Sequence, residues 1–218
     1  MAGNHVLDHP DSSARLRAAL LVGSAADPGS LTELVNRCAV EPDFFVRDML
    51  TWALTRLPAA DTVPFLVSEL GSEVAQARSQ ALHTLSKIGD RSVWPSVARL
   101  LTDPDDEVAR SAWRAAAVLV PDAERARTAE VLAAQFGRGD ADTRLSLSRA
   151  LLALGESGET VARAAIESRD PIVSEHAADT MRLLSDPDSG ASSALHSARR
   201  AAALGAERMR AADEGREL

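Results

Sequence analysis

The sequence predicts an all-α, right-handed α-solenoid of about six helical-hairpin repeats with a long C-terminal capping helix. Three observations predict this fold class. Apolar residues recur at helical spacing, the pattern returns about every 31 residues, and an Asp precedes nearly every copy by the same distance. A single amphipathic helix cannot bury its apolar face alone, so the copies must stack on one another.

Residues 74–90 show the repeated pattern most clearly. Ala77, Ala81, Leu85 and Ile88 follow one another at steps of 4, 4 and 3, which places them on one face of a helix. Gly89 follows where a left-handed C-terminal cap is favoured. The aligned copies begin at Ala14, Val46, Ala77, Val108, Thr143 and Val173, at intervals of 32, 31, 31, 35 and 30 residues.

Two further positions of the alignment carry polar residues. Three residues before the copies lie Asp11, Asp43, Val74, Asp105, Asp140 and Asp170. Asp caps a helix by accepting from its free N–H groups, so we expect five of these six residues to be N-caps. One residue after the starts lie Arg15, Arg47, Arg78, Ala109, Arg144 and Ser174. We expect an Arg at this position to reach the capping Asp of a neighbouring repeat and to form a ladder.

Shorter amphipathic segments between these helices complete the hairpins. Residues 30–33 form a capping box, which predicts a helix through about Ala39. Residues 61–64 and 92–95 open the next two helices with Pro in the first turn, where its missing N–H has no helical partner. Residues 122–136 and 157–168 supply the last two, and residues 137–142 lengthen the fourth interval, which predicts a local change in curvature.

The two ends differ from the repeats. Residues 1–10 are short and polar, and we expect them to be disordered. Residues 11–185 form the solenoid as one continuous domain. Residues 186–218 contain a capping helix over about 191–213 and a frayed tail. A polar terminal cap stops such stacks from associating end to end.

Composition and charge exclude several classes of protein. The 218-residue chain has a formal net charge of −8, which disfavours binding to nucleic acid and to anionic membranes. Its one cysteine, Cys38, excludes an internal disulfide and is interpreted as a small buried hydrophobe. Neither a signal-peptide pattern nor an apolar run of membrane-spanning length is present, so we expect a cytoplasmic protein.

The repeat unit resembles the HEAT repeat, an armadillo-type α-solenoid unit, over about residues 11–185. The openings Val63-Pro64 and Trp94-Pro95 are similar to those of the short variety named after phycobiliprotein lyases. This resemblance implies a binding scaffold. The family also includes bilin lyases, an iron-dependent hydroxylase of a modified lysine, and DNA glycosylases.

The residues for metal or nucleophilic chemistry are not in place. Resemblance to the hydroxylases would require paired His-Glu dipeptides, and none of the five histidines is followed by Glu: His5, His9, His83, His176 and His196. A Gly-rich phosphate loop is also missing. We therefore expect no catalytic residue, no metal and no cofactor.

The repeat register predicts which residues face the inner surface. Six residues into the copies lie Leu20, Trp52, His83, Arg114, Arg149 and Asp179, and Arg110 lies two residues into the fourth copy. Our site hypothesis is that an acidic peptide or protein surface binds Trp52, His83, Arg110, Arg114 and Arg149, because Trp and Arg commonly anchor interfaces. In the competing interpretation, the Arg side chains are a solvated face that pairs locally, and Trp52 packs into a neighbouring repeat.

These observations favour a non-catalytic scaffold or adaptor that binds a protein partner through its concave face. One alternative is a chaperone or lyase subunit resembling the bilin lyases, which the aromatic content of 3% disfavours. The other is a HEAT-like nucleic-acid-binding protein, which the net negative charge disfavours.

Overall fold

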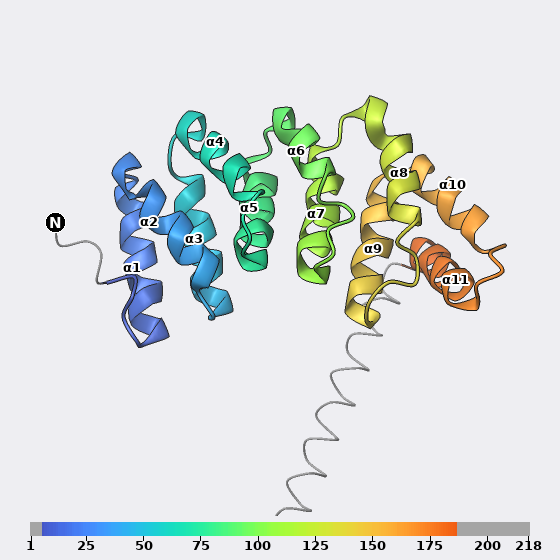
Figure 1. Ribbon diagram of the computed structural model, residues 1–218, viewed down its shortest axis with the longest axis horizontal. Coiled ribbons are helices and arrows are strands. Elements are labelled where there is room, and N and C mark those ends of the chain that lie inside the picture. Colours follow the sequence, from blue (N-terminus) through green and yellow to red (C-terminus); the bar gives the residue numbers. More distant parts are fainter. Residues whose placement is uncertain (1–5, 187–218) are drawn as a thin grey trace, which may run out of the picture.

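The computed structural model describes residues 6–186, which form helices and no strands. The odd-numbered helices stack in one layer: α1 (Ser12–Ala25), α3 (Phe44–Thr55), α5 (Ala75–Ile88), α7 (Asp106–Leu119), α9 (Ala141–Ala153) and α11 (Pro171–Ser185) (Figure 1). The even-numbered helices pack against them: α2 (Leu31–Val40), α4 (Ala59–Glu69), α6 (Trp94–Ala98), α8 (Arg125–Ala133) and α10 (Glu156–Ala165). Three 3₁₀ turns precede α2, α6 and α8: η1 (Pro28–Ser30), η2 (Arg91–Val93) and η3 (Asp122–Glu124). The predicted all-α solenoid is confirmed.

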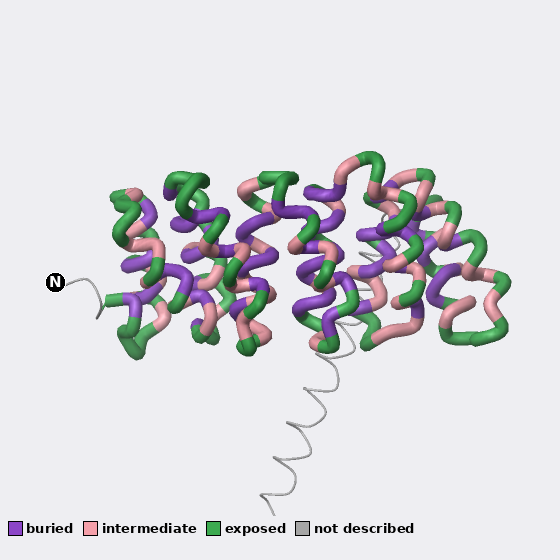
Figure 2. The backbone as a smooth tube through the Cα atoms, turned by 45° about the horizontal axis from the view of Figure 1, so that its top comes forward, coloured by how far each residue is buried: buried purple, intermediate pink, exposed green. Residues whose placement is uncertain are grey.

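The core lies between stacked helices and consists mainly of Ala, Leu and Val. Buried residues follow the helix faces that meet other helices (Figure 2). Trp113 is fully buried, and its indole Nε1–H donates to the carbonyl of Leu101 at 2.8 Å. Cys38 is buried, as predicted, and burial raises the pKa of its thiol to about 12. The apolar positions of the repeat are therefore the positions that hold neighbouring helices together.

The capping residues are also confirmed. Five Asp side chains accept hydrogen bonds from backbone N–H groups at the starts of their helices: Asp11, Asp43, Asp105, Asp140 and Asp170. Val74 stands at the same place before α5 and provides no side-chain hydrogen bond. Five of the six odd-numbered helices, all except α5, therefore have a side-chain acceptor for one or two of their first N–H groups.

The predicted ladder from Arg to the neighbouring capping Asp is wrong. Arg15 binds both carboxylate oxygens of Glu41 at 2.7 Å, and Arg78 binds both oxygens of Asp103 at 3.1 Å. Each acidic partner lies two residues before the next cap, and its side chain also accepts the N–H of that cap residue. The capping Asp is already occupied by its own helix, so the next available carboxylate takes the guanidinium.

Arg side chains also donate hydrogen bonds to backbone carbonyls of the loops that precede their helices. Arg15, Arg47 and Arg78 each donate from Nη1 to the carbonyls six and five residues earlier. The fourth copy has Ala109 at this position, and the two equivalent carbonyls accept instead from Nη2 of Arg138, at 2.7 and 3.1 Å. Arg138 also pairs with Asp106 at 2.8 Å. A residue of the following repeat thus replaces the missing Arg.

Two predicted helix starts differ from the structure. Ser30 makes no capping hydrogen bond through its side chain, because η1 precedes α2 and Asp27 caps that turn. Ser30 Oγ instead donates to the carbonyl of Asp27 at 2.6 Å. Helix α4 begins at Ala59, so Pro64 lies inside it rather than in its first turn, whereas Pro95 lies in the first turn of α6 as predicted.

The expectation of disorder over residues 1–10 does not hold for residues 6–10. Leu7 is 2% exposed and belongs to the core, and Asp8 pairs with Arg37 at 3.0 Å. One buried apolar side chain and one ion pair thus fix a segment whose polar composition predicts disorder. The predicted capping helix over 191–213 lies outside the described residues.

Candidate partner-binding groove

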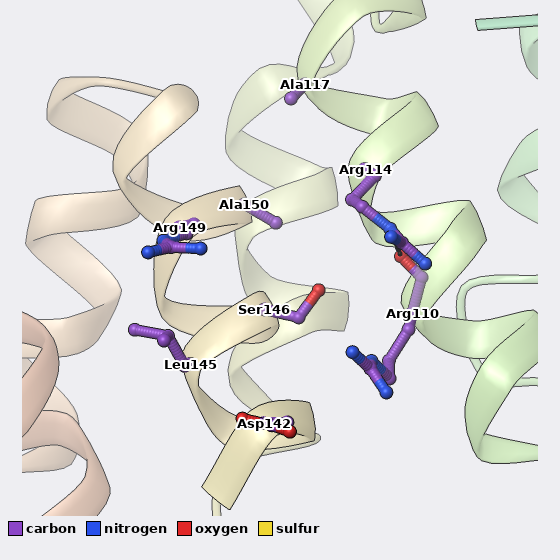
Figure 3. A pocket seen from close by; sticks show the side chains of 8 residues that line it. All are labelled: Arg110, Arg114, Ala117, Asp142, Leu145, Ser146, Arg149 and Ala150. Atoms are coloured by element: carbon purple, nitrogen blue, oxygen red, sulfur yellow. Dashed lines mark hydrogen bonds between the residues drawn. The ribbon is translucent and has the colours of Figure 1, made fainter. Parts of the chain in front are cut away.

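Helices α7 and α9 border an open groove with a volume of about 330 Å³. We call it the α7/α9 groove. Its lining residues are Arg110, Arg114 and Ala117 from α7, and Asp142, Leu145, Ser146, Arg149 and Ala150 from α9 (Figure 3). Three of the five predicted site residues, Arg110, Arg114 and Arg149, therefore lie around one groove. The register predicts them because positions two and six residues into a copy lie on the same helix face.

On α7, Arg110 and Arg114 are held by different partners. Arg110 pairs with Glu107 at 2.5 Å, while its Nε atom is buried without a hydrogen-bond partner among the described residues. Arg114 donates from Nε to the carbonyl of Arg110 at 3.2 Å and from Nη2 to Ser111 Oγ at 3.3 Å. Burial lowers the pKa of Arg114, and the nearby charge of Arg110 lowers it further, although Glu107 opposes this. The Arg114 charge thus has neutral acceptors and a cationic neighbour.

On α9, Arg149 is exposed and forms no hydrogen bond or ion pair with any residue of the described range. Ser146 contributes a hydroxyl to the same side, and Asp142 is the one acidic lining residue. Figure 3 shows Arg110 and Arg114 on one side of the groove, with Ser146, Asp142 and Arg149 on the other. The groove therefore offers guanidinium groups from two helices.

His83 lies on α5 beside the groove but does not line it. Burial lowers the pKa of its imidazole, as do the charges of Lys87 and Arg114, while Asp48 opposes the shift. The ring is therefore mainly neutral at pH 7. It lies within electrostatic reach of Arg114 and adds no charge for an anionic ligand at that pH.

Trp52 lies farther along the layer, on α3, and packs against α1. A Cβ atom added at Gly23 would lie 2.5 Å from Cζ3 of Trp52, so only glycine leaves room for the ring. The side chain remains 37% exposed, and Leu20 beside it in the register is 45% exposed. The structure thus does not bring Trp52 to the groove, and its contact with α1 matches the competing interpretation of packing into a neighbouring repeat.

The sequence did not single out a buried imidazole network at the C-terminal end of the stack. His176 Nδ1 accepts the N–H of Gly137 at 3.0 Å, so the ring proton lies on Nε2, which is 2.9 Å from the carbonyl of Arg144. Nε2 is also 3.1 Å from Ser148 Oγ, which in turn lies 2.7 Å from Thr180 Oγ1. Burial lowers the pKa of His176.

This serine–histidine pair does not resemble an accessible nucleophile. Ser148 and His176 are each 3% exposed, and neither lines the α7/α9 groove. The hydrogen bonds instead connect α9, α11 and the loop at Gly137. One signal in the sequence could have indicated that His176 is buried: it lies three residues into the last copy, beside the apolar positions of the repeat.

Among residues 6–186, no three or more His, Cys, Asp or Glu side chains gather in a way that could hold a metal ion. Within the same range, no helix combines the length and apolar character needed to cross a membrane.

The stacked helix pairs define an α-solenoid repeat protein. Residues 41–118 match the family model described as HEAT repeats. The match spans α3 to α7, which includes the α7 side of the groove.

Solved structures that match this chain include two engineered proteins and a human enzyme. One engineered protein is 17% identical with a TM-score of 0.46, and the similarity covers 83% of this chain and 96% of the other. The second is 21% identical with a TM-score of 0.43, over 86% and 96% of the two chains. Human deoxyhypusine hydroxylase is 18% identical with a TM-score of 0.43, over 82% of each chain. The search of curated proteins found no match.

Proposed function

We propose that this HEAT-repeat protein is a non-catalytic scaffold that binds an acidic protein segment in the α7/α9 groove. The observation that supports this most is the presence of two guanidinium groups, Arg114 and Arg149, that line one groove without a carboxylate partner among the described residues. A bound carboxylate would supply the missing counter-charge, and Arg binds carboxylates through paired hydrogen bonds.

An acidic protein segment fits the surroundings of the groove better than a nucleic acid does. The chain carries a net charge of −8, so a long polyanion is repelled by most of its surface. Exposed acids, Asp48 on α3 and Glu175 on α11, lie on the odd-numbered layer to either side of the groove along the stack. A short segment can place its acids at the groove and avoid those positions.

The test compares two double charge reversals with the same change in net charge. In Arg114→Glu/Arg149→Glu, both unpaired cations of the groove are reversed. In the control, Arg99→Glu/Arg127→Glu, the two changed residues are exposed and belong to α8 and the end of α6 in the other layer. Circular dichroism checks that both variants keep the helical content of the wild type.

Binding is measured by fluorescence anisotropy with a fluorescein-labelled decaglutamate peptide at low salt. We expect the groove variant to bind at least about tenfold more weakly than the control, because hydrogen bonds to charged groups contribute about 1.5–3 kcal/mol each. Equal weakening in both variants would indicate a nonspecific effect of net charge and would overturn the assignment to the groove.

A further inference from the structure

Resting on this proposed function, we infer that the α7/α9 groove recognises a phosphorylated residue of the partner segment rather than a single carboxylate. The inference rests on Arg114 of α7 and Arg149 of α9. These two arginines line opposite sides of one groove, and neither forms an ion pair among the described residues.

The charge of the ligand follows from the charges that the groove leaves unpaired. Arg110 is compensated by Glu107, whereas Arg114 has only a carbonyl and a hydroxyl as partners. Arg149 has no partner among residues 6–186, and its charge adds to that of Arg114. A phosphate monoester carries about −1.5 to −2 charges at pH 7, which matches two unpaired cations. Asp142 also lines the groove but forms no ion pair with Arg114 or Arg149. A dianion can therefore pair with both arginines, whereas one carboxylate supplies a single charge.

The distribution of donors also suits a phosphoryl group. Arginine side chains of α7 and α9 line the groove, and Ser146 points from α9 toward α7 and adds a hydroxyl (Figure 3). The buried Nε of Arg110 is one more donor without a partner. The three terminal oxygens of a phosphoryl group can accept from two sides at once, whereas the two oxygens of a carboxylate lie in one plane.

Acidic residues in and beside the groove favour a phosphorylated peptide over a nucleic acid as the ligand. Asp142 stands on its α9 side, and exposed Asp48 and Glu175 lie along the same layer. A nucleic acid places a phosphate at every nucleotide and would bring some of them near these acids. A peptide with one phosphorylated residue concentrates its charge at the cationic groove.

The experiment uses the full chain and three fluorescein-labelled peptide mixtures. Each mixture has four random non-acidic residues on either side of a fixed centre, which is phosphoserine, serine or Glu-Glu. We expect the phosphoserine mixture to bind at least about tenfold more tightly than the other two. Arg149→Glu is expected to remove this preference, and the control Arg127→Glu is expected to keep it.

A second measurement locates the anion directly. Inorganic phosphate is titrated at pH 7.5 into uniformly ¹⁵N-labelled protein, with glutarate as the dicarboxylate control. We expect the Nε–Hε signals of Arg110, Arg114 and Arg149 to shift with phosphate at lower concentration than with glutarate. Shifts spread over arginines outside the groove would contradict the inference.

The outcomes separate this inference from the proposed function. If the Glu-Glu mixture binds as tightly as the phosphoserine mixture and depends on Arg149, the phosphoryl inference fails and the proposed function stands. If no mixture binds in a way that depends on Arg149, both fail. If polyuridylic acid displaces the phosphoserine mixture at 150 mM salt and binds more tightly than it does, the ligand is a nucleic acid and the peptide assignment is overturned.

Discussion

Replacing Glu41 by Gln is expected to destabilise the N-terminal repeats strongly, because this fully buried carboxylate holds two guanidinium groups. Arg15 donates to it from Nε and Nη2, both at 2.7 Å, and Arg37 donates at 2.9 and 2.7 Å. The N–H of Asp43 adds a fifth hydrogen bond, at 2.9 Å. A neutral Gln keeps the shape of the side chain and leaves the buried Arg15 without its counter-ion.

The magnitude can be worked out in two ways. Burial acts to raise the pKa of Glu41, but hydrogen bonds from Arg15, the Asp43 N–H and Arg37 outweigh it and lower that pKa to about 2, from an ordinary value of 4.5. At about 1.36 kcal/mol per unit, this difference corresponds to about 3 kcal/mol in favour of the folded state. Breaking a buried ion pair by removing one partner costs about 3–5 kcal/mol. The two figures agree.

Urea unfolding followed by circular dichroism at pH 7 measures the loss, with Glu73→Gln as the control. Glu73 is exposed in the loop between α4 and α5, so its replacement should change the free energy of unfolding by no more than about 0.5 kcal/mol. Because the folded pKa of Glu41 is lowered, its contribution is complete above about pH 4.5 and disappears as the pH falls toward 2. This component should be missing from Glu41→Gln. A loss under about 1 kcal/mol at pH 7 would refute the reasoning.

Two further variants test the caps and the buried imidazole. Val74→Asp should stabilise the protein by about 0.5–2 kcal/mol in the same urea assay, because α5 lacks the side-chain cap that the other odd-numbered helices have; no gain would mean that the Val74 backbone is not suited to capping. The lowered pKa of His176 means that the unfolded chain takes up the proton first, so its contribution is complete above about pH 6.5 and is lost as the pH falls below that value. His176→Asn, which can still accept the Gly137 N–H through its amide oxygen, should therefore be less stable at pH 7 but lose less stability than the wild type between pH 7 and 5.5; an unchanged pH dependence would contradict this.

The repeats and their caps could be predicted from the sequence because both are local. Helical spacing of Ala and Leu fixes which face is buried, and an Asp three residues before a copy caps the helix that follows it. The partner of Arg78 could not be predicted in this way. It depends on which carboxylate the next loop leaves unoccupied, and Asp103 stands at a position that the alignment did not include.

The candidate site could be predicted in part for a similar reason. The register places Arg110, Arg114 and Arg149 on one face, and they do line one groove. It could not predict that the absence of a side chain at Gly23 would let the ring of Trp52 settle onto α1. Contacts between repeats depend on the size of residues about 30 positions apart, which a periodic pattern does not specify.

The guanidinium of Arg138 has a consequence for consensus design of this chain. Aligned position by position, Ala109 is a departure from the Arg that four other copies carry, and a consensus procedure would restore Arg there. The two carbonyls that such an Arg would bind are already occupied by Arg138, and Ala109 is fully buried. The substitution would place a second cation at a filled acceptor site. A consensus sequence for this chain must therefore be checked against contacts between repeats. Here Arg138, which belongs to the following repeat, makes the contacts that an Arg would make in the repeat before it.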